Sequence, residues 1–144
     1  MNILKFVNVS DNSSESYSAI SSALYLKKRG HNVYLMGEKN SYASVFSSKN
    51  KLEFIECGIY SKLGFIKIPD CDIVEIYGYS KWNSLVLNKI MSLKSPKILR
   101  LTSFPDADFA EFIKKNINSF SLITVVSQSI KDELVFAQIK ADKD

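Results

Sequence analysis

The sequence is poor in the residues that build metal and nucleophile sites. It holds one histidine, His31, and two isolated cysteines, Cys57 and Cys71. The cysteines lack the close spacing of a zinc ligand set, so we expect no metal site. A Ser-His-Asp or Cys-His nucleophile system would have to use His31, which directly follows Gly30 at the expected end of a helix. These residue types therefore identify no catalytic group.

Long apolar runs are also missing. No segment approaches the roughly 18 apolar residues that a membrane span needs. The first nine residues lead into the polar Ser10-Asp11-Asn12 without a cleavage-site pattern, so they predict a strand and not a signal peptide. We expect a cytoplasmic protein. The 19 Lys+Arg and 15 Asp+Glu give a net charge of +4 spread along the chain, which permits an anionic partner but gives no reason to expect nucleic acid.

The hydrophobic residues, 46% of the 144, alternate between strand-like runs and helix-length segments. Strands are predicted at residues 1–9, 32–36, 52–56, 72–77, 97–102 and 122–126. Helices are predicted from about residue 16 to 29, at 42–48 and 80–93, from Asp106, and from Ser129, where Ser129-Ile130-Lys131-Asp132 matches a capping box. Residues 58–71 predict a long loop with one short strand around Phe65–Ile68.

This alternation predicts one α/β domain over residues 1–144. The sheet is expected to be doubly wound, mostly parallel and six-stranded, a Rossmann-like sheet with helices on both faces. With strand order 3-2-1-4-5-6, a ligand would bind beyond the carboxyl ends of the strands, where the order reverses between strands one and four. Hydroxyls, amides and aromatic rings are common in the four loops at that edge, residues 10–16, 77–81, 102–106 and 127–129. The first of these loops has no glycine, so dinucleotide binding there is not expected.

Four segments resemble elements of GT-B glycosyltransferases of the family-4-like group, in the same order and spacing. KKRGHNVYLMG resembles the family's "KRGHEV" element, and PDCDIVEIYGY its "D-x-D-I-V-H-x-H" strand. SPKILRLTSF is similar to its fifth strand, and FSLITVVSQSIKDEL to its "AD-x-I-I-A-V-S-E-x-x-K-x-x-L" strand and helix. The four segments are distributed over nearly the whole chain.

The resemblance implies the N-terminal, acceptor-binding half of a two-domain enzyme that moves a sugar from a nucleotide-sugar donor to a glycan or lipid-linked acceptor. The donor site lies mainly in the second half, so the partner expected is a C-terminal donor-binding domain or a second polypeptide. This chain would hold no cofactor and be inactive alone, with peripheral contact at the inner face of the membrane. The expected acceptor- or substrate-binding residues are Ser10, Asp11, Ser13, Ser14, Tyr77, Gly78, Tyr79, Arg100, Thr102 and Ser127.

Departures from the family pattern leave other interpretations open. Ser13-Ser14 replaces a glycine pair, and the family's strand histidines fall at Glu75, Tyr77 and near Thr102. A non-catalytic remnant or regulatory module of the same fold is therefore one alternative. A flavodoxin-like FMN-binding module is another, with the hydroxyl-rich first loop holding the phosphate. A phosphoacceptor receiver domain is excluded, because its acidic pair and its lysine are missing.

Two groups of residues have both a structural and a functional interpretation. Glu75, a carboxylate inside a buried strand, is expected either to pair with Arg100 or to leave Arg100 free to hold a phosphate or carboxylate. Tyr79 is expected to be exposed and able to stack on a sugar ring, whereas Trp82 suits helix packing. In residues 59–68, a solvated loop is favoured over a membrane contact.

Overall fold

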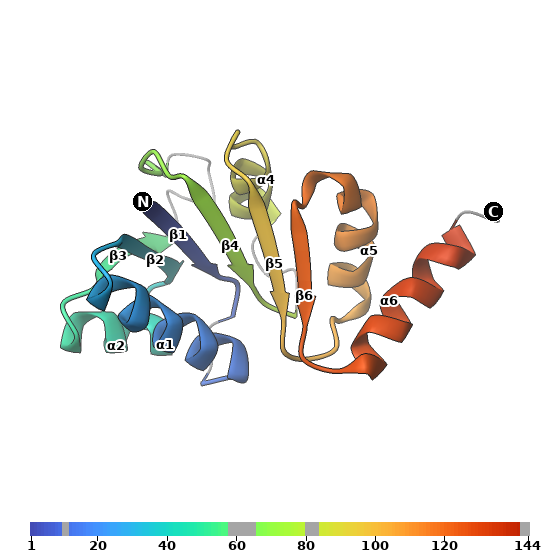
Figure 1. The fold of residues 1–144 in the computed structure, drawn as a ribbon, viewed down its shortest axis with the longest axis horizontal. Helices are drawn as coiled ribbons and strands as arrows, with labels where there is room; N and C mark the ends of the chain where they lie inside the picture. Colours follow the sequence, from blue (N-terminus) through green and yellow to red (C-terminus); the bar gives the residue numbers. More distant parts are fainter. Residues whose placement is uncertain (10–11, 58–65, 80–83, 142–144) are drawn as a thin grey trace.

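The computed structural model describes residues 1–9, 12–57, 66–79 and 84–141, and the side chains of these residues except those of Ser84 and residues 136–141. Six strands form one parallel sheet (Figure 1). They are β1 (Asn2–Val7), β2 (Asn32–Glu38), β3 (Glu53–Cys57), β4 (Ile73–Tyr77), β5 (Lys97–Leu101) and β6 (Leu122–Val125). The helices between and after them are α1 (Ser14–Lys28), α2 (Tyr42–Lys49), α4 (Ser84–Met91), α5 (Ala107–Lys115), the short 3-10 helix η1 (Ile117–Ser119) and α6 (Gln128–Ala141).

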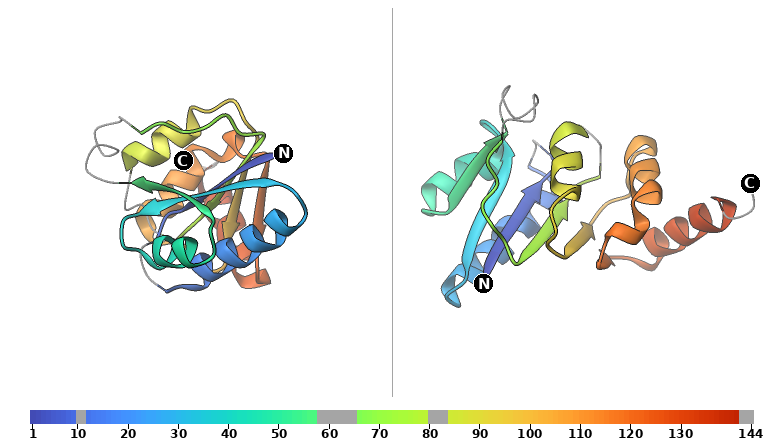
Figure 2. Two further views of the ribbon diagram at one scale, coloured as in Figure 1. Left: turned by 90° about the vertical axis from the view of Figure 1, so that its left-hand side faces the viewer. Right: turned by 90° about the horizontal axis from the view of Figure 1, so that it is seen from above.

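The strand order is β3-β2-β1-β4-β5-β6, which confirms the predicted fold class and the predicted order. Parallel neighbouring strands must be joined by crossover connections, which are right-handed. The chain moves in one direction along the sheet from β1 to β3 and in the other from β4 to β6, so the helices of the two halves lie on opposite faces. Helices α1 and α2 cover one face and α4 and α5 the other (Figure 2). The flavodoxin order 2-1-3-4-5 has β1 beside β3, whereas β1 here lies beside β4. The flavodoxin-like interpretation is therefore wrong in its topology.

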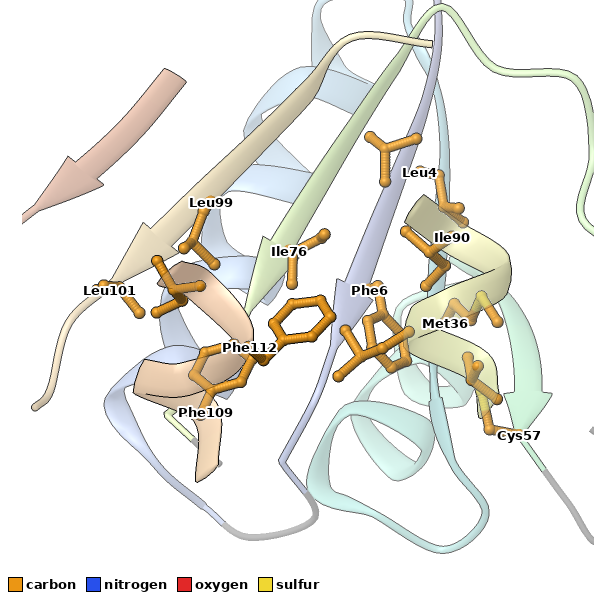
Figure 3. Close-up of a cluster of buried hydrophobic side chains, with 14 of the residues drawn as sticks. Leu4, Phe6, Met36, Cys57, Ile76, Ile90, Leu99, Leu101, Phe109 and Phe112 are labelled. Carbon is orange, nitrogen blue, oxygen red and sulfur yellow. The ribbon is translucent and has the colours of Figure 1, made fainter. Parts of the chain in front are cut away.

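Each face of the sheet has its own apolar core. On the face of α4 and α5, Phe6, Ile76 and Leu99 of the sheet pack with Ile90 and Phe109 of the helices (Figure 3). On the other face, the buried residues of α1 pack with sheet residues; the cluster includes Val7, Leu35, Tyr77, Ala19, Ile20 and Ala23. The small side chains of α1 let the helix lie close to β1 and β2.

Helix ends follow the expected capping chemistry in two places. The Asp106 carboxylate accepts a hydrogen bond from the backbone N–H of Phe109 at 2.8 Å, which caps α5 as predicted. Gly30 has a φ of 84°, the left-handed conformation that a residue just past a helix adopts, and it follows α1. Helix α1 begins at Ser14, two residues before the predicted start, because the hydroxyl of Ser13 caps it by accepting from the Ser16 N–H.

The capping box predicted at Ser129 is wrong. Helix α6 begins at Gln128, and the hydroxyl of Ser127 accepts from the N–H of Ile130 at 3.3 Å. The carboxylate of Asp132, which a capping box would direct back to the N–H of Ser129, instead accepts from the Gln128 amide at 2.6 Å. The earlier hydroxyl therefore caps the helix.

The predicted short strand around 65–68 is not found in its described part, because residues 66–71 carry no regular structure. The rest of that segment lies outside the described residues, as do Ser10, Asp11 and Trp82. In the described part of the chain, no helix combines the length and apolar character needed to cross a bilayer.

Candidate functional site

The carboxyl ends of β1, β4 and β5 lie next to one another at one edge of the sheet. The backbone N–H of Asn8, just after β1, donates to the carbonyl of Tyr77 at 2.7 Å. The N–H of Asp106, at the start of α5, donates to the carbonyl of Tyr79 at 2.7 Å. These two bonds fix the loops after β1, β4 and β5 relative to one another at the position where the strand order reverses.

Gly78 permits the close approach of these loops. A Cβ atom placed at Gly78 would lie 2.9 Å from Cβ of Asn8 and 3.3 Å from its backbone oxygen. Contacts between carbon atoms are favourable at about 3.5–4.0 Å. Any other residue at position 78 would therefore force the ends of β1 and β4 apart.

Three hydroxyl groups meet where α1 begins and β5 ends. Ser14 Oγ lies 3.0 Å from Thr102 Oγ1 and 3.4 Å from Ser103 Oγ. We call Ser14, Thr102 and Ser103 the hydroxyl cluster. Ser14 also donates to Oε2 of the fully buried Glu15 at 3.2 Å, while Oε1 of Glu15 has no hydrogen-bond partner among the described residues. The cluster thus combines hydroxyl donors and acceptors with a carboxylate that has spare acceptor capacity.

The structure brings together only some of the expected site residues. Ser13, Ser14 and Thr102 lie at the α1–β5 junction, and each is at least partly exposed. Gly78 is buried between the strand ends. Ser127 follows β6 at the same edge, where its hydroxyl caps α6. Ser10 and Asp11 lie outside the described residues.

Two tyrosines differ from expectation. The prediction that the Tyr77 side chain binds a ligand is wrong, because this side chain is completely buried and its hydroxyl donates to Glu75 Oε2 at 2.8 Å. Tyr79 is half-buried and packs against the core on the α1 face, so the expectation of an exposed ring is also wrong. Strand alternation explains the first case, since Tyr77 shares the α1 face with Val7 and Leu35.

A charged cluster lies beneath α1, formed by Lys5, Glu75, Tyr77, Ser22 and Arg100. Lys5 is fully buried and forms an ion pair with Glu75 Oε2, its direct neighbour across β1 and β4. Its Nζ also donates to Ser22 Oγ at 3.0 Å and to Tyr77 OH at 3.1 Å. Arg100 Nη2 donates to Glu75 Oε1 at 2.9 Å. The sheet thereby binds α1 through polar contacts at Ser22 as well as through apolar packing.

The expected pairing of Glu75 with Arg100 is confirmed, but it is diagonal and not direct. In the register of β4 and β5, Arg100 lies opposite Tyr77, and Glu75 lies opposite Ile98. The closer partner of Glu75 is Lys5, which we did not expect from the sequence. The signal was present, because Lys5 and Glu75 are the single charged residues inside the two apolar runs ILKFV and IVEIY.

Burial and pairing oppose each other in the pKa values of this cluster. Burial lowers the pKa of Lys5 more than the attraction of Glu75 raises it. Burial alone would raise the pKa of Glu75, but the charge of Lys5 and hydrogen bonds from Lys5, Arg100 and Tyr77 bring it below its usual range. Glu75 therefore stabilises the fold above its unfolded pKa of about 4.3, and this contribution is lost as the pH falls through the lower folded value. Burial, with the neighbouring Glu75, raises the pKa of Tyr77 and keeps this side chain a neutral hydrogen-bond donor.

We predict a modest stability loss for Arg100→Met. Glu75 keeps Lys5 as a buried counter-charge in this variant, so no carboxylate is left unpaired. The lost charge-assisted hydrogen bond corresponds to about 1–2 kcal/mol of unfolding free energy. Urea unfolding of the two proteins measures it. A loss of about 3–5 kcal/mol, typical of a broken buried pair, would show that Lys5 does not compensate.

A cavity lies away from this edge. It has a volume of about 240 Å³ and lies between α5, β6 and α6. Its walls are mostly apolar, with Ile113, Ile123 and Leu134 among them, and the charged side chains that the described residues contribute are Lys114 and Lys131. None of the expected site residues that the structure describes is among its lining. Among the described residues, no group of three or more His, Cys, Asp or Glu side chains could hold a metal ion.

Comparison with known proteins supports the architecture. No protein-family model matches the chain, and no curated protein matches it. A solved structure described as "Structure of MT0777" superposes with a TM-score of 0.59 over 96% of this chain and 97% of that one, at 12% sequence identity. At such low identity the likeness shows the fold alone, a Rossmann-like α/β domain with a parallel sheet.

Proposed function

We propose that this chain is the acceptor-side domain of a GT-B glycosyltransferase and binds a glycan or lipid-linked acceptor beside the hydroxyl cluster. The observation that carries the proposal is the contact of Ser14 with Thr102 and Ser103 at the reversal of strand order. Open α/β sheets bind ligands at this position. Hydroxyl side chains both donate and accept, so they match the hydroxyls of a sugar.

The residues beside the hydroxyl cluster support the same ligand class. Oε1 of Glu15 is a buried acceptor without a partner among the described residues, and such groups are rare in folded proteins unless water or a ligand satisfies them. A carboxylate accepts hydrogen bonds from sugar hydroxyls but repels phosphate. The immediate surroundings of Ser14 therefore favour a hydroxyl-bearing ligand over a nucleotide phosphate.

Chemistry would require a second, donor-binding domain or polypeptide. Glycosyl transfer needs a donor phosphate to be held and its leaving charge neutralised while the acceptor is positioned. The roles proposed for this chain are to bind the acceptor and orient it. Glu75 and Tyr77, which stand where the resemblance has histidines, are buried and hydrogen-bonded to each other within the charged cluster. This observation also favours the second candidate, a non-catalytic module of the same fold.

Acceptor binding separates these two candidates. The chain is titrated with a panel of neutral and charged oligosaccharides while backbone amide chemical shifts are recorded. If the chain binds an acceptor, the amide signals of residues 14–16 and 102–104 should shift. The double variant Ser14→Ala/Thr102→Val should bind the acceptor at least tenfold more weakly, because both hydroxyl contacts are lost. Ser48→Ala, an exposed serine on α2, is the control. Absence of binding across the panel would favour the non-catalytic module.

We predict that the isolated chain binds no nucleotide sugar more tightly than about millimolar, an affinity of only about 4 kcal/mol. The donor contacts belong to the second domain under this proposal. Isothermal titration calorimetry with common nucleotide sugars measures the affinity, and nucleotide release on incubation with acceptors measures turnover. Micromolar binding of a nucleotide sugar would contradict the assignment to the acceptor side.

A further inference from the structure

In the part of the chain that the structure describes, the face of the sheet that carries α1 and α2 is partly exposed over its other half, β5 and β6. Side chains alternate between the two faces along a strand. In β5 and β6, the residues that pack on the opposite face are Leu99, Leu101, Ile123 and Val125. The residues that alternate with them therefore lie on this face; they are Ile98, Arg100, Leu122 and Thr124. Leu122 is 51% exposed, although it is a large apolar residue within a strand. The side chain of Arg100 is 36% exposed. Arg100 therefore lies at the border between the covered and the exposed halves of this face.

Charge does not balance at this border. Glu75 is the single carboxylate of the charged cluster, and it is shared by two cations. Lys5 takes Oε2 and is fully buried, so the unbalanced positive charge lies with the partly exposed Arg100. Arg100 thus carries a net positive charge into the half of the sheet face on which the described residues place no helix.

The guanidinium of Arg100 also has unused hydrogen-bond donors. An arginine has five N–H donors in a planar fork, and in the described structure one nitrogen, Nη2, has an acceptor. Nε is buried and has no partner among the described residues. A charged donor without an acceptor is costly, whereas a carboxylate or phosphate can accept from two nitrogens of the fork at once. The geometry is that of an arginine held through Nη2 by Glu75, with other N–H donors of its guanidinium left for an oxyanion.

The hydroxyl cluster lies within reach of the same ligand. Thr102 follows Arg100 by two residues, just past the end of β5, and Thr102 Oγ1 lies 3.0 Å from Ser14 Oγ. Thr124 lies directly opposite Arg100 on β6. A ligand with an anionic group and neighbouring hydroxyls could therefore contact Arg100 and the hydroxyl cluster together.

We propose that Arg100 forms an oxyanion subsite and that the ligand of this edge is an anionic sugar, one that carries a carboxylate or a phosphate. The anionic group accepts hydrogen bonds from the guanidinium, and the sugar hydroxyls contact Ser14 and Thr102. This assignment of the ligand class rests on the proposed acceptor-binding function, whereas the oxyanion subsite itself rests on the geometry of Arg100. Lysine would be a poorer substitute, because its ammonium lacks the planar fork that binds Glu75 and an oxyanion together.

Two sugars that differ only in a carboxylate provide the test. The full chain is titrated at low ionic strength with methyl glucuronide, methyl glucoside, glucose 6-phosphate and inorganic phosphate, with amide and arginine Nε–Hε shifts recorded. The sequence has two arginines, so Arg29→Met and Arg100→Met assign the two side-chain signals and remove the same charge at different places. Arg29 lies at the far end of α1 beside Tyr25, which makes Arg29→Met the matched control.

We expect methyl glucuronide and glucose 6-phosphate to bind about tenfold more tightly than methyl glucoside. Arg100→Met should remove this preference, and Arg29→Met should retain it. In the wild-type protein, inorganic phosphate should move the Nε–Hε signal of Arg100 and the amides of residues 100–103. This last measurement does not depend on whether an Arg100 variant folds. The relative affinities for methyl glucuronide and glucose 6-phosphate identify the preferred oxyanion.

Equal affinities for methyl glucuronide, glucose 6-phosphate and methyl glucoside would overturn the inference. So would an equal loss of preference in Arg29→Met, or phosphate-induced shifts at Lys114 and Lys131 in place of Arg100. The two proposals fail separately. Binding of inorganic phosphate at Arg100 without affinity for any sugar would support the oxyanion subsite and contradict acceptor binding. Sugar binding at Ser14 regardless of charge would support acceptor binding and contradict the subsite.

Discussion

Glu75→Gln should lower the free energy of unfolding by about 3–5 kcal/mol at pH 7, the range for a buried ion pair that loses one partner. The amide keeps the size of the side chain, so the loss is electrostatic. Lys5, which is fully buried, would then have the Tyr77 and Ser22 hydroxyls as its neighbours and no negative charge. Arg100 would remain as a second cation in the same cluster. Urea unfolding monitored by circular dichroism measures the change.

The pH dependence of this variant identifies Lys5 as the cause. Burial already lowers the pKa of Lys5, and removing Glu75 takes away the charge that raises it. Between the lowered folded pKa and the unfolded value of about 10.4, the unfolded chain binds more protons, so stability rises with pH. Glu75→Gln should therefore regain stability from pH 7 to 10 more steeply than the wild-type protein. Glu56→Gln, which removes an exposed carboxylate 3.7 Å from Lys39, is the control and should change stability little. A pH-independent loss in Glu75→Gln would contradict this explanation.

Gly78→Ala should destabilise the protein by about 2–3 kcal/mol, in the range for an overpacked site. The new Cβ would lie 2.9 Å from Cβ of Asn8, an atom that cannot move away without the backbone after β1. The same displacement would disturb the hydrogen bond from Asn8 to Tyr77 and separate the strand ends that position the candidate site. Thermal unfolding measures the stability change.

A second glycine provides the comparison for this substitution. Gly30 has a φ of 84° with open space around it, and asparagine tolerates this conformation. Gly30→Asn should therefore lower the free energy of unfolding by much less than Gly78→Ala does. If Gly78→Ala unfolds at the wild-type temperature, the close approach of β1 and β4 does not depend on glycine.

The fold was predictable because its signals are local and repeated. Each predicted strand is a short apolar run, and helix-length segments force parallel pairing and a crossover. Boundaries were less predictable where several hydroxyls compete for one role, as at Ser127 and Ser129, since either can cap the following helix. Which serine caps α6 is linked to the hydrogen bond of Asp132 with the Gln128 amide, and the sequence motif does not specify this bond.

The candidate site was predictable in its place but not in its composition. Parallel topology puts Ser14 and Thr102 at one edge whatever their contacts are. Tyr77 was misplaced because a residue at the end of a strand can point to either face, and alternation from Glu75 directs it under α1. Lys5 was missed because pairing across β1 and β4 depends on register, and its partner is 70 residues away in the chain.

That separation has a consequence for how the chain is made. Ribosomes add about 5–20 residues per second, so roughly 4–14 s pass between the synthesis of Lys5 and that of Glu75. During this interval β1, α1 and β2 can emerge, but Lys5 has no carboxylate opposite it, and the face beneath α1 cannot exclude water without burying an unpaired ammonium. The nascent N-terminal half is therefore held incomplete until β4 arrives, and docking of β4 against β1 becomes the event that commits the domain to its final structure.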